Sequence, residues 1–201
     1  MPPPALQILE PAGVEEGKSV ETAGDALSGI AMHGSGIRVV LVNDRPASLK
    51  ARSAQSVQFE AAGLPLTEGW TPVTVVVRSM DDSQSQLSFK LRRPTVQWMN
   101  PPGGVLETAA TAILAQGVAV GFSAVEKVEL AGSSLKLEKL GDGRVEFHTI
   151  LPLALGQNTF QGVAVGSSGV RVNFKLEVKR VPGQTGRLRP GLTVPPSKTL
   201  Q

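Results

Sequence analysis

The chain has 201 residues, of which 41% are hydrophobic and 18% charged, and its formal net charge is +3. It contains no cysteine, which excludes disulfides, thiolate zinc ligands and thiol catalysis. The hydrophobic content is enough for one or two ordinary cores, and no apolar stretch is long enough to cross a bilayer. We therefore expect a folded protein that does not insert into a membrane.

The excess positive charge lies at the C-terminus. Residues 1–94 carry 9 Lys/Arg against 10 Asp/Glu, and residues 95–181 carry 8 against 7. Residues 182–201 carry three basic residues and no acidic one. A surface for nucleic acid would need clustered basic residues and stacking aromatics on a folded domain. We therefore expect no nucleic-acid partner.

Two halves of the chain follow the same pattern. Residues 6–11 (LQILEP) recur as residues 96–101 (VQWMNP), and residues 64–69 (LPLTEG) recur as residues 151–156 (LPLALG). A unit of roughly ninety residues is long enough for an independent domain. The repeat predicts one domain over residues 1–93 and a second over 94–181, followed by a Pro/Gly-rich basic tail over 182–201.

In the first copy, Gly29 precedes a valine-rich segment, and Phe59 follows it in an alternating stretch. Near the end of this copy Leu87, Phe89 and Leu91 alternate with polar residues, which predicts a half-buried strand. The copies then join through residues 92–95, which are too few for a flexible tether. We expect the two domains to hold a restricted angle.

In the second copy, residues 107–115 are interpreted as a loop that enters a strand, because β-branched residues interrupt their alanines. Gly117 and Phe147 match Gly29 and Phe59, and residues 141–143 (GDG) predict a hairpin turn. Apolar residues alternate again over 172–178, and the shared Phe-Lys-Leu sequence aligns Phe174 with Phe89. Both copies therefore consist of short strands separated by turns.

Residues 153–165 (LALGQNTFQGVAV) and the small-residue loop 166–169 (GSSG) carry the clearest family signature. With the opening strands that end at Pro11 and Pro101, they resemble tandem bacterial immunoglobulin-like domains over residues 5–181. The first copy departs from the signature, because residues 70–72 (WTP) follow Gly69 where the signature has Asn. The resemblance implies an all-β fold of two tandem immunoglobulin-like β-sandwiches of about seven strands each, with an irregular C-terminal tail.

Enzyme motifs do not fit their required context. Residues 12–19 (AGVEEGKS) resemble a loosened phosphate loop, but Glu15 and Glu16 would repel phosphate and no helix is predicted to follow. His33 and His148 fall in different domains without a partner motif. We expect no catalytic residue and no enzyme activity.

Acidic residues that could start a calcium loop are Asp81, Asp82 and Asp142. Calcium needs six to eight oxygen ligands, usually from several closely spaced carboxylates, and these positions lack a repeated Asp-x-Asp pattern. They are interpreted as turn residues. We expect neither a metal site nor a cofactor.

Aromatic side chains are the candidates for a binding face. Trp70 follows a turn glycine and is the predicted partner contact, whereas Trp98 aligns with Ile8 and is expected in a core or between the domains. Phe122 is a weaker third candidate. In the tail, the predicted partner contacts are Leu188, Arg189, Leu192 and Val194, in a segment that is either a linker or a docking strand.

The sequence thus favours a non-enzymatic structural or interaction module. It predicts a two-domain spacer or assembly subunit of a bacterial surface, secreted or multi-protein structure, which contacts a protein partner or further copies through sheet edges and the tail. The alternative is an accessory carbohydrate-binding module that uses Trp70. The expected location is extracellular or on the cell surface.

Overall fold

The structure of the protein is a computed structural model that describes residues 2–141 and 143–183. Its first half contains nine strands within the described residues. They are β1 (Ala5–Glu10), β2 (Ser19–Glu21), β3 (Leu27–Met32), β4 (Ile37–Val42), β5 (Arg45–Pro46), β6 (Ser48–Ser53), β7 (Ser56–Ala61), β8 (Thr71–Ser79) and β9 (Gln84–Arg92).

The second half contains nine strands and one short 3-10 helix within the same described residues. They are β10 (Thr95–Asn100), η1 (Pro102–Gly104), β11 (Val105–Thr108), β12 (Ala112–Val120), β13 (Val125–Leu130), β14 (Ser133–Ser134), β15 (Leu137–Gly141), β16 (Arg144–Pro152), β17 (Gly156–Gly166) and β18 (Arg171–Arg180). The segment 107–115, predicted as a loop that enters a strand, contains a loop over 109–111 that enters β12, but its first two residues belong to β11.

The strand order defines the fold. The first half forms the sheets β1-β3-β7-β6 and β2-β9-β8-β4-β5, and the second forms β10-β12-β16-β15 and β11-β18-β17-β13-β14. The seven longer strands of each half follow the order of an immunoglobulin sandwich, ABED on one sheet and CFG on the other. The short strands β2 and β5, with β11 and β14, extend the second sheet. The prediction of two tandem immunoglobulin-like sandwiches is confirmed.

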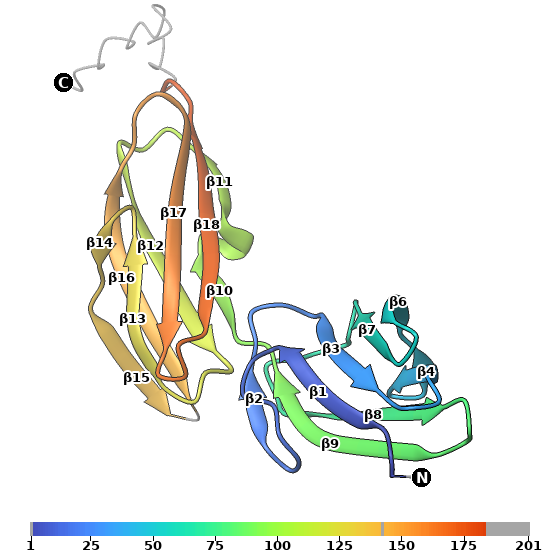
Figure 1. The fold of residues 1–201 in the computed structure, drawn as a ribbon. Helices are drawn as coiled ribbons and strands as arrows, with labels where there is room; N and C mark the ends of the chain where they lie inside the picture. The colour runs from blue at the N-terminus through green and yellow to red at the C-terminus, as the bar shows by residue number, and fades with distance from the viewer. Residues whose placement is uncertain (1, 142, 184–201) are drawn as a thin grey trace, which may run out of the picture.

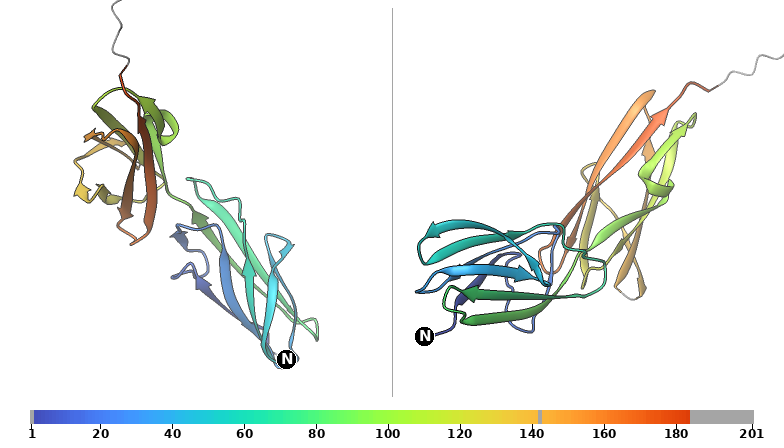
Figure 2. Two further views of the ribbon diagram at one scale, coloured as in Figure 1. Left: turned by 90° about the horizontal axis from the view of Figure 1, so that it is seen from above. Right: turned by 90° about the vertical axis from the view of Figure 1, so that its right-hand side faces the viewer.

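Each sandwich has its own core. In the first, residues from both sheets pack together around Phe59, Val75 and Leu91, all fully buried. In the second, buried residues around Phe147 and Leu176 pack together with Trp98. Within the part of the chain that the structure describes, the two cores share no residue. Figures 1 and 2 show the sandwiches end to end, with a bend at a single short connection.

A glycine opposite a phenylalanine explains part of the repeat. Gly29 on β3 pairs with Phe59 on β7, and Gly117 on β12 pairs with Phe147 on β16. A Cβ atom on either glycine would lie 2.5 Å from the phenylalanine ring. The ring therefore occupies the space of the missing side chain, which requires glycine at both positions.

The strand registers correct one sequence alignment. The β4–β8 and β13–β17 ladders have the same register, so Gly162 corresponds to Val75. Val75 pairs with Leu87, and Gly162 pairs with Phe174. Phe174 is therefore the counterpart of Leu87, and Phe89 corresponds to Leu176. The alignment of the two Phe-Lys-Leu sequences is therefore wrong by two residues. A shift of two residues leaves each side chain on the same face of its strand, so the alternation of apolar and polar residues does not reveal it.

Candidate functional site

The most highly organised polar cluster lies where the two sandwiches meet. It is centred on Glu21, the last residue of β2, whose side chain is only 2% exposed. From the second sandwich, the Ser168 hydroxyl donates to Glu21 Oε2 at 2.5 Å, and the Ser123 backbone N–H donates to Oε1. Both serines lie in turns at the near end of that sandwich. One carboxylate of the first domain thus binds two loops of the second.

Arg92, at the end of β9, completes this cluster. Its Nη2 donates to Glu21 Oε1 at 2.6 Å and to the Ser123 hydroxyl at 2.7 Å. Its guanidinium lies 4.1 Å from the centre of the Trp70 ring. A cation over an indole face is favourable, and it fixes the side chain that links the domains.

Hydrogen bonding outweighs burial in setting the charge of the carboxylate. Burial alone would raise the pKa of Glu21, but donors from Ser168, Ser123 and Arg92 hold that pKa below its ordinary value of 4.5. Glu21 is therefore ionised at neutral pH. A buried carboxylate with this many donors is costly to separate from them, because its charge would be left unpaired.

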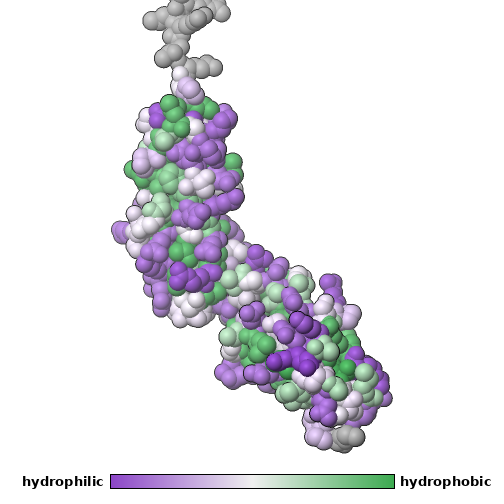
Figure 3. All heavy atoms as spheres, turned by 45° about the horizontal axis from the view of Figure 1, so that its top comes forward, coloured by the Kyte–Doolittle hydropathy of each residue, from purple (hydrophilic) through white to green (hydrophobic). Residues whose placement is uncertain are grey.

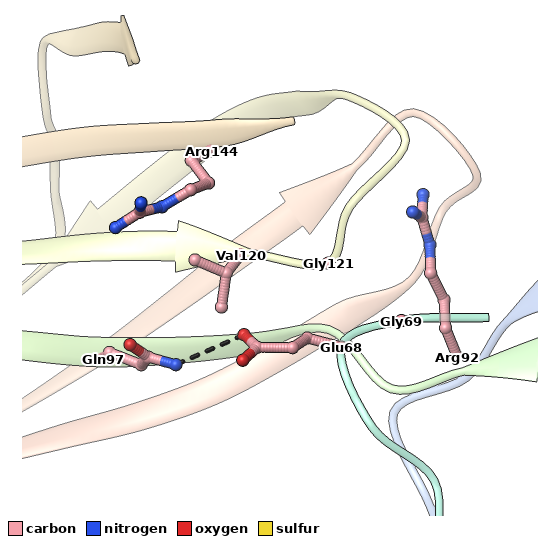
Figure 4. A pocket seen from close by; sticks show the side chains of 7 residues that line it. All are labelled: Glu68, Gly69, Arg92, Gln97, Val120, Gly121 and Arg144. Carbon is pink, nitrogen blue, oxygen red and sulfur yellow. Dashed lines mark hydrogen bonds between the residues drawn. The ribbon is translucent and has the colours of Figure 1, made fainter. Parts of the chain in front are cut away.

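A second contact lies beside the first, around a cavity of about 370 Å³ (Figure 4). Gln97 Nε2 donates to Glu68 Oε2 at 3.2 Å across the junction. Gly121 approaches Glu68 so closely that a Cβ on the glycine would lie 3.0 Å from Glu68 atoms. In Figure 4 the Arg92 and Arg144 guanidinium groups point in different directions. The lining residues hold the domains together and do not converge on a common point.

The predicted aromatic residues have different environments. Trp70 is 40% exposed beside the junction, with Arg92 over its ring. Trp98 lies in the core, as predicted: its ring meets Phe147 and Phe174 edge-on at 5.8 and 5.6 Å. Phe122 is 1% exposed and packs in the second core, so the suggestion that it offers a ring for binding is wrong.

The predicted tail contacts Leu188, Arg189, Leu192 and Val194 lie outside the described residues, as does the candidate turn residue Asp142. They stay predictions. Within the described residues, no group of three or more His, Asp or Glu side chains is placed to hold a metal ion. In that same part of the chain, no helix is long and apolar enough to span a membrane.

The other motif residues take structural roles. The segment 12–19 leads into strand β2 and not into a helix, and Glu16 accepts a hydrogen bond from the Ser88 backbone N–H. His33 is 7% exposed, with Nε2 donating to the Pro2 carbonyl at 2.9 Å. His148 is exposed on β16, as predicted. The two histidines lie in different sandwiches.

Sequence reasoning missed the four residues that form the junction cluster, Glu21, Arg92, Ser123 and Ser168. They are ordinary polar residues in turns or at strand ends, and their partners lie up to 147 positions away along the chain. The weak signal that was present is the match of Glu21 to Glu107, at the corresponding point of the second copy.

No family model matches the chain, and no curated protein matches it by sequence. Among solved structures, it is similar to the fibronectin(III)-like modules of Clostridium thermocellum CbhA, with 12% identity over 88% of this chain and 94% of that chain, and a TM-score of 0.31. The N-terminal Ig1-2 module of Drosophila receptor protein tyrosine phosphatase DLAR gives 10% identity, coverage of 89% and 99%, and a TM-score of 0.31.

A third similar structure is the Bacteroides ovatus mixed-linkage glucan utilization locus protein SGBP-B in complex with a mixed-linkage heptasaccharide. Its identity is 10%, it covers 82% of this chain and 43% of that chain, and its TM-score is 0.27. These scores are too low to carry function across, so the fold rests on the strand order described above. By that order the protein is a pair of tandem immunoglobulin-like domains.

Proposed function

We propose that the protein is a non-enzymatic spacer module, in which the Glu21 cluster holds two immunoglobulin-like domains at a set angle and so presents their surfaces to partners. The single observation that carries this proposal is the burial of Glu21 against donors from both sandwiches. Interdomain contacts within a chain are ordinarily small and mobile. A buried, multiply bonded carboxylate favours one arrangement over others, because moving the domains apart leaves its charge unpaired.

In this proposal the units are residues 1–93, 94–181 and 182–201, and the protein works outside the cell or at a bacterial surface. Partner proteins bind at sheet edges and at the tail residues Leu188, Arg189, Leu192 and Val194. The edge strand β6 supports the first of these routes, since all six of its residues are exposed and one of its edges has no neighbouring strand among residues 2–141 and 143–183.

Spin labels test whether the angle is set. Because the chain has no cysteine, Lys50→Cys on β6 and Glu138→Cys on β15 place one label on each sandwich. We expect pulsed electron paramagnetic resonance to give one narrow distance distribution at pH 7. Glu21→Ala should broaden it, because Ser123 and Ser168 lose their shared acceptor.

The matched control is Glu15→Ala. Glu15 is also a glutamate of the first sandwich, but its side chain is 66% exposed and forms an ion pair with the nearby Lys18. This variant should leave the distribution unchanged. A broad distribution in the protein that retains Glu21 would reject the spacer function.

A second candidate function is carbohydrate binding at Trp70. The exposed ring beside the polar cavity of Glu68, Gln97 and Arg144 favours it. Retention on a panel of polysaccharides should then be lost in Trp70→Ala. Retention that survives this substitution removes Trp70 from the site.

A further inference from the structure

The acid–base pair at the junction has a counterpart at the far end of the second sandwich. Glu21 pairs with Arg92 in the parallel ladder of β2 and β9, and Glu107 pairs with Lys179 in the parallel ladder of β11 and β18. The charged atoms lie 2.6 Å apart in the first pair and 3.0 Å in the second. Both sandwiches therefore end in the same arrangement, which we call the C-terminal pole.

The two C-terminal poles differ in what covers them. At the first, Glu21 is buried by turns of the second sandwich. At the second, the Glu107 and Lys179 side chains are 59% and 57% exposed. Leu155, in the loop before β17, is 63% exposed. Figure 3 shows this end of the second sandwich as mixed hydrophobic and hydrophilic surface beside the grey residues.

The opposite ends of the sandwiches also correspond, through matching turns. The Met80 N–H donates to the Gly36 carbonyl in the first sandwich, as the Ser167 N–H donates to the Ala124 carbonyl in the second. Ser35, which precedes Gly36, therefore corresponds to Ser123, which precedes Ala124. Asp81, which follows Met80, corresponds to Ser168, which follows Ser167. We call these two turns, residues 35–36 with 80–81 and residues 123–124 with 167–168, the N-terminal pole of each sandwich.

We propose that Glu107 and Lys179 form a docking surface for the N-terminal pole of a further immunoglobulin-like sandwich that carries serine at both turn positions, as the second domain does. Such a partner would donate a backbone N–H and a hydroxyl group to Glu107, as Ser123 and Ser168 donate to Glu21. Its second serine hydroxyl would accept from Lys179, as the Ser123 hydroxyl accepts from Arg92. This inference rests on the proposed function, because it assumes that the Glu21 junction is a working contact.

The first sandwich of another copy does not fit this surface. Ser35 matches Ser123, but Asp81 would face Glu107 where Ser168 faces Glu21. The Ser79 hydroxyl donates to Asp81 at 2.5 Å and lowers the pKa of its carboxyl, so Asp81 is ionised at neutral pH. Two ionised carboxylates that face each other across such a contact repel each other. The surface therefore selects a partner and opposes end-to-end chains of identical molecules.

Three-sandwich fusions test the proposal. In each fusion a third sandwich follows Val181, which occupies the position that Pro94 has at the natural junction. The added unit is either a second copy of residues 95–181, the second-type fusion, or a second copy of residues 5–92, the first-type fusion. Each appended unit brings its own core. One label is placed at Glu138→Cys of the middle sandwich, and the other at Glu138→Cys or Lys50→Cys of the appended one.

We expect the appended second-type sandwich to give a narrow distance distribution, and the appended first-type sandwich to give one at least about twofold broader. Asp81→Ser in the appended first-type unit should narrow the distance distribution again. In the second-type fusion, Glu107→Ala in the middle sandwich should broaden the distribution. Equal widths for the two fusions, or no effect of Glu107→Ala, would overturn the proposal.

The natural junction is measured in the same background with labels at Lys50→Cys and Glu138→Cys. A narrow distance distribution across the natural junction, together with a broad one across the appended junction, rejects this inference alone. A broad distance distribution across the natural junction rejects the spacer function itself.

Discussion

At the scale of single residues, Gly29 shows how close packing restricts the choice of amino acid. A Cβ at this position would lie 2.5 Å from both the Phe59 ring and the Gln7 carbonyl oxygen. The carbonyl belongs to a paired strand and cannot move without disturbing the β1–β3 ladder. The glycine is thus needed for space, at a position where its backbone is ordinary β-strand.

We predict that Gly29→Ala destabilises the first sandwich by about 1–3 kcal/mol, the usual effect of overpacking a core. Urea denaturation followed by tryptophan fluorescence and circular dichroism measures the loss. Gly34→Ala is the matched control, because a Cβ on Gly34 would meet nothing within 4 Å. Equal stability of the Gly29→Ala variant and the parent protein would contradict this packing.

The charge of Glu21 gives a pH dependence with a definite sign. The folded structure lowers the pKa of this carboxyl below its ordinary value of 4.5, so folding favours the ionised form. The resulting stabilisation is complete above the ordinary value and is lost as the pH falls through the lower, folded-state pKa. Acid should therefore weaken the junction before it unfolds the cores.

We predict that the stability difference between the parent protein and Glu21→Gln narrows as the pH falls from 7 through 4.5 and below. Urea midpoints at a series of pH values measure it. Glu15→Gln, at an exposed site, should show no such convergence. A parent–variant difference that stays constant with pH would show that the Glu21 charge does not act as described.

At the scale of elements, the paired strands β2–β9 and β11–β18 place equivalent ion pairs in different surroundings. Arg92 and Glu21 are 14% and 2% exposed, whereas Lys179 and Glu107 are more than half exposed. Exposed pairs contribute roughly 0–1 kcal/mol, but removing one partner of a buried pair leaves a charge uncompensated.

We predict that Arg92→Ala lowers the free energy of unfolding by about 3 kcal/mol, and Lys179→Ala by less than about 0.5 kcal/mol. Chemical denaturation of both variants provides the comparison. Similar losses from the two substitutions would mean that the second sandwich does not bury the first pair.

Element by element, the core is what the sequence predicts best. Alternation around Leu91 and Leu176 identifies buried strand faces, because side chains on a strand point alternately to opposite sides. The same alternation cannot detect a shift of two residues, which is why Phe89 and Phe174 were aligned wrongly. The junction cluster lies beyond such reasoning, since Ser123 and Ser168 gain their role only from the angle between the sandwiches.

At the scale of the whole molecule, two separate cores are connected by a short linker, by the buried Glu21 cluster and by the neighbouring contact of Gln97 with Glu68. The linker limits how far the sandwiches can separate, and the Glu21 cluster selects one orientation among those that the linker allows. Trp70 adds to this selection, because its ring supports the Arg92 guanidinium. Surfaces far apart on the two domains are thereby held in a fixed relation.

Residual dipolar couplings of the backbone amides at pH 7 test this central claim most directly. If the junction fixes the angle, the couplings of both sandwiches fit a single alignment tensor calculated from one arrangement of the two domains. Separate tensors of clearly different magnitude for the two sandwiches would show independent motion, and would contradict the account.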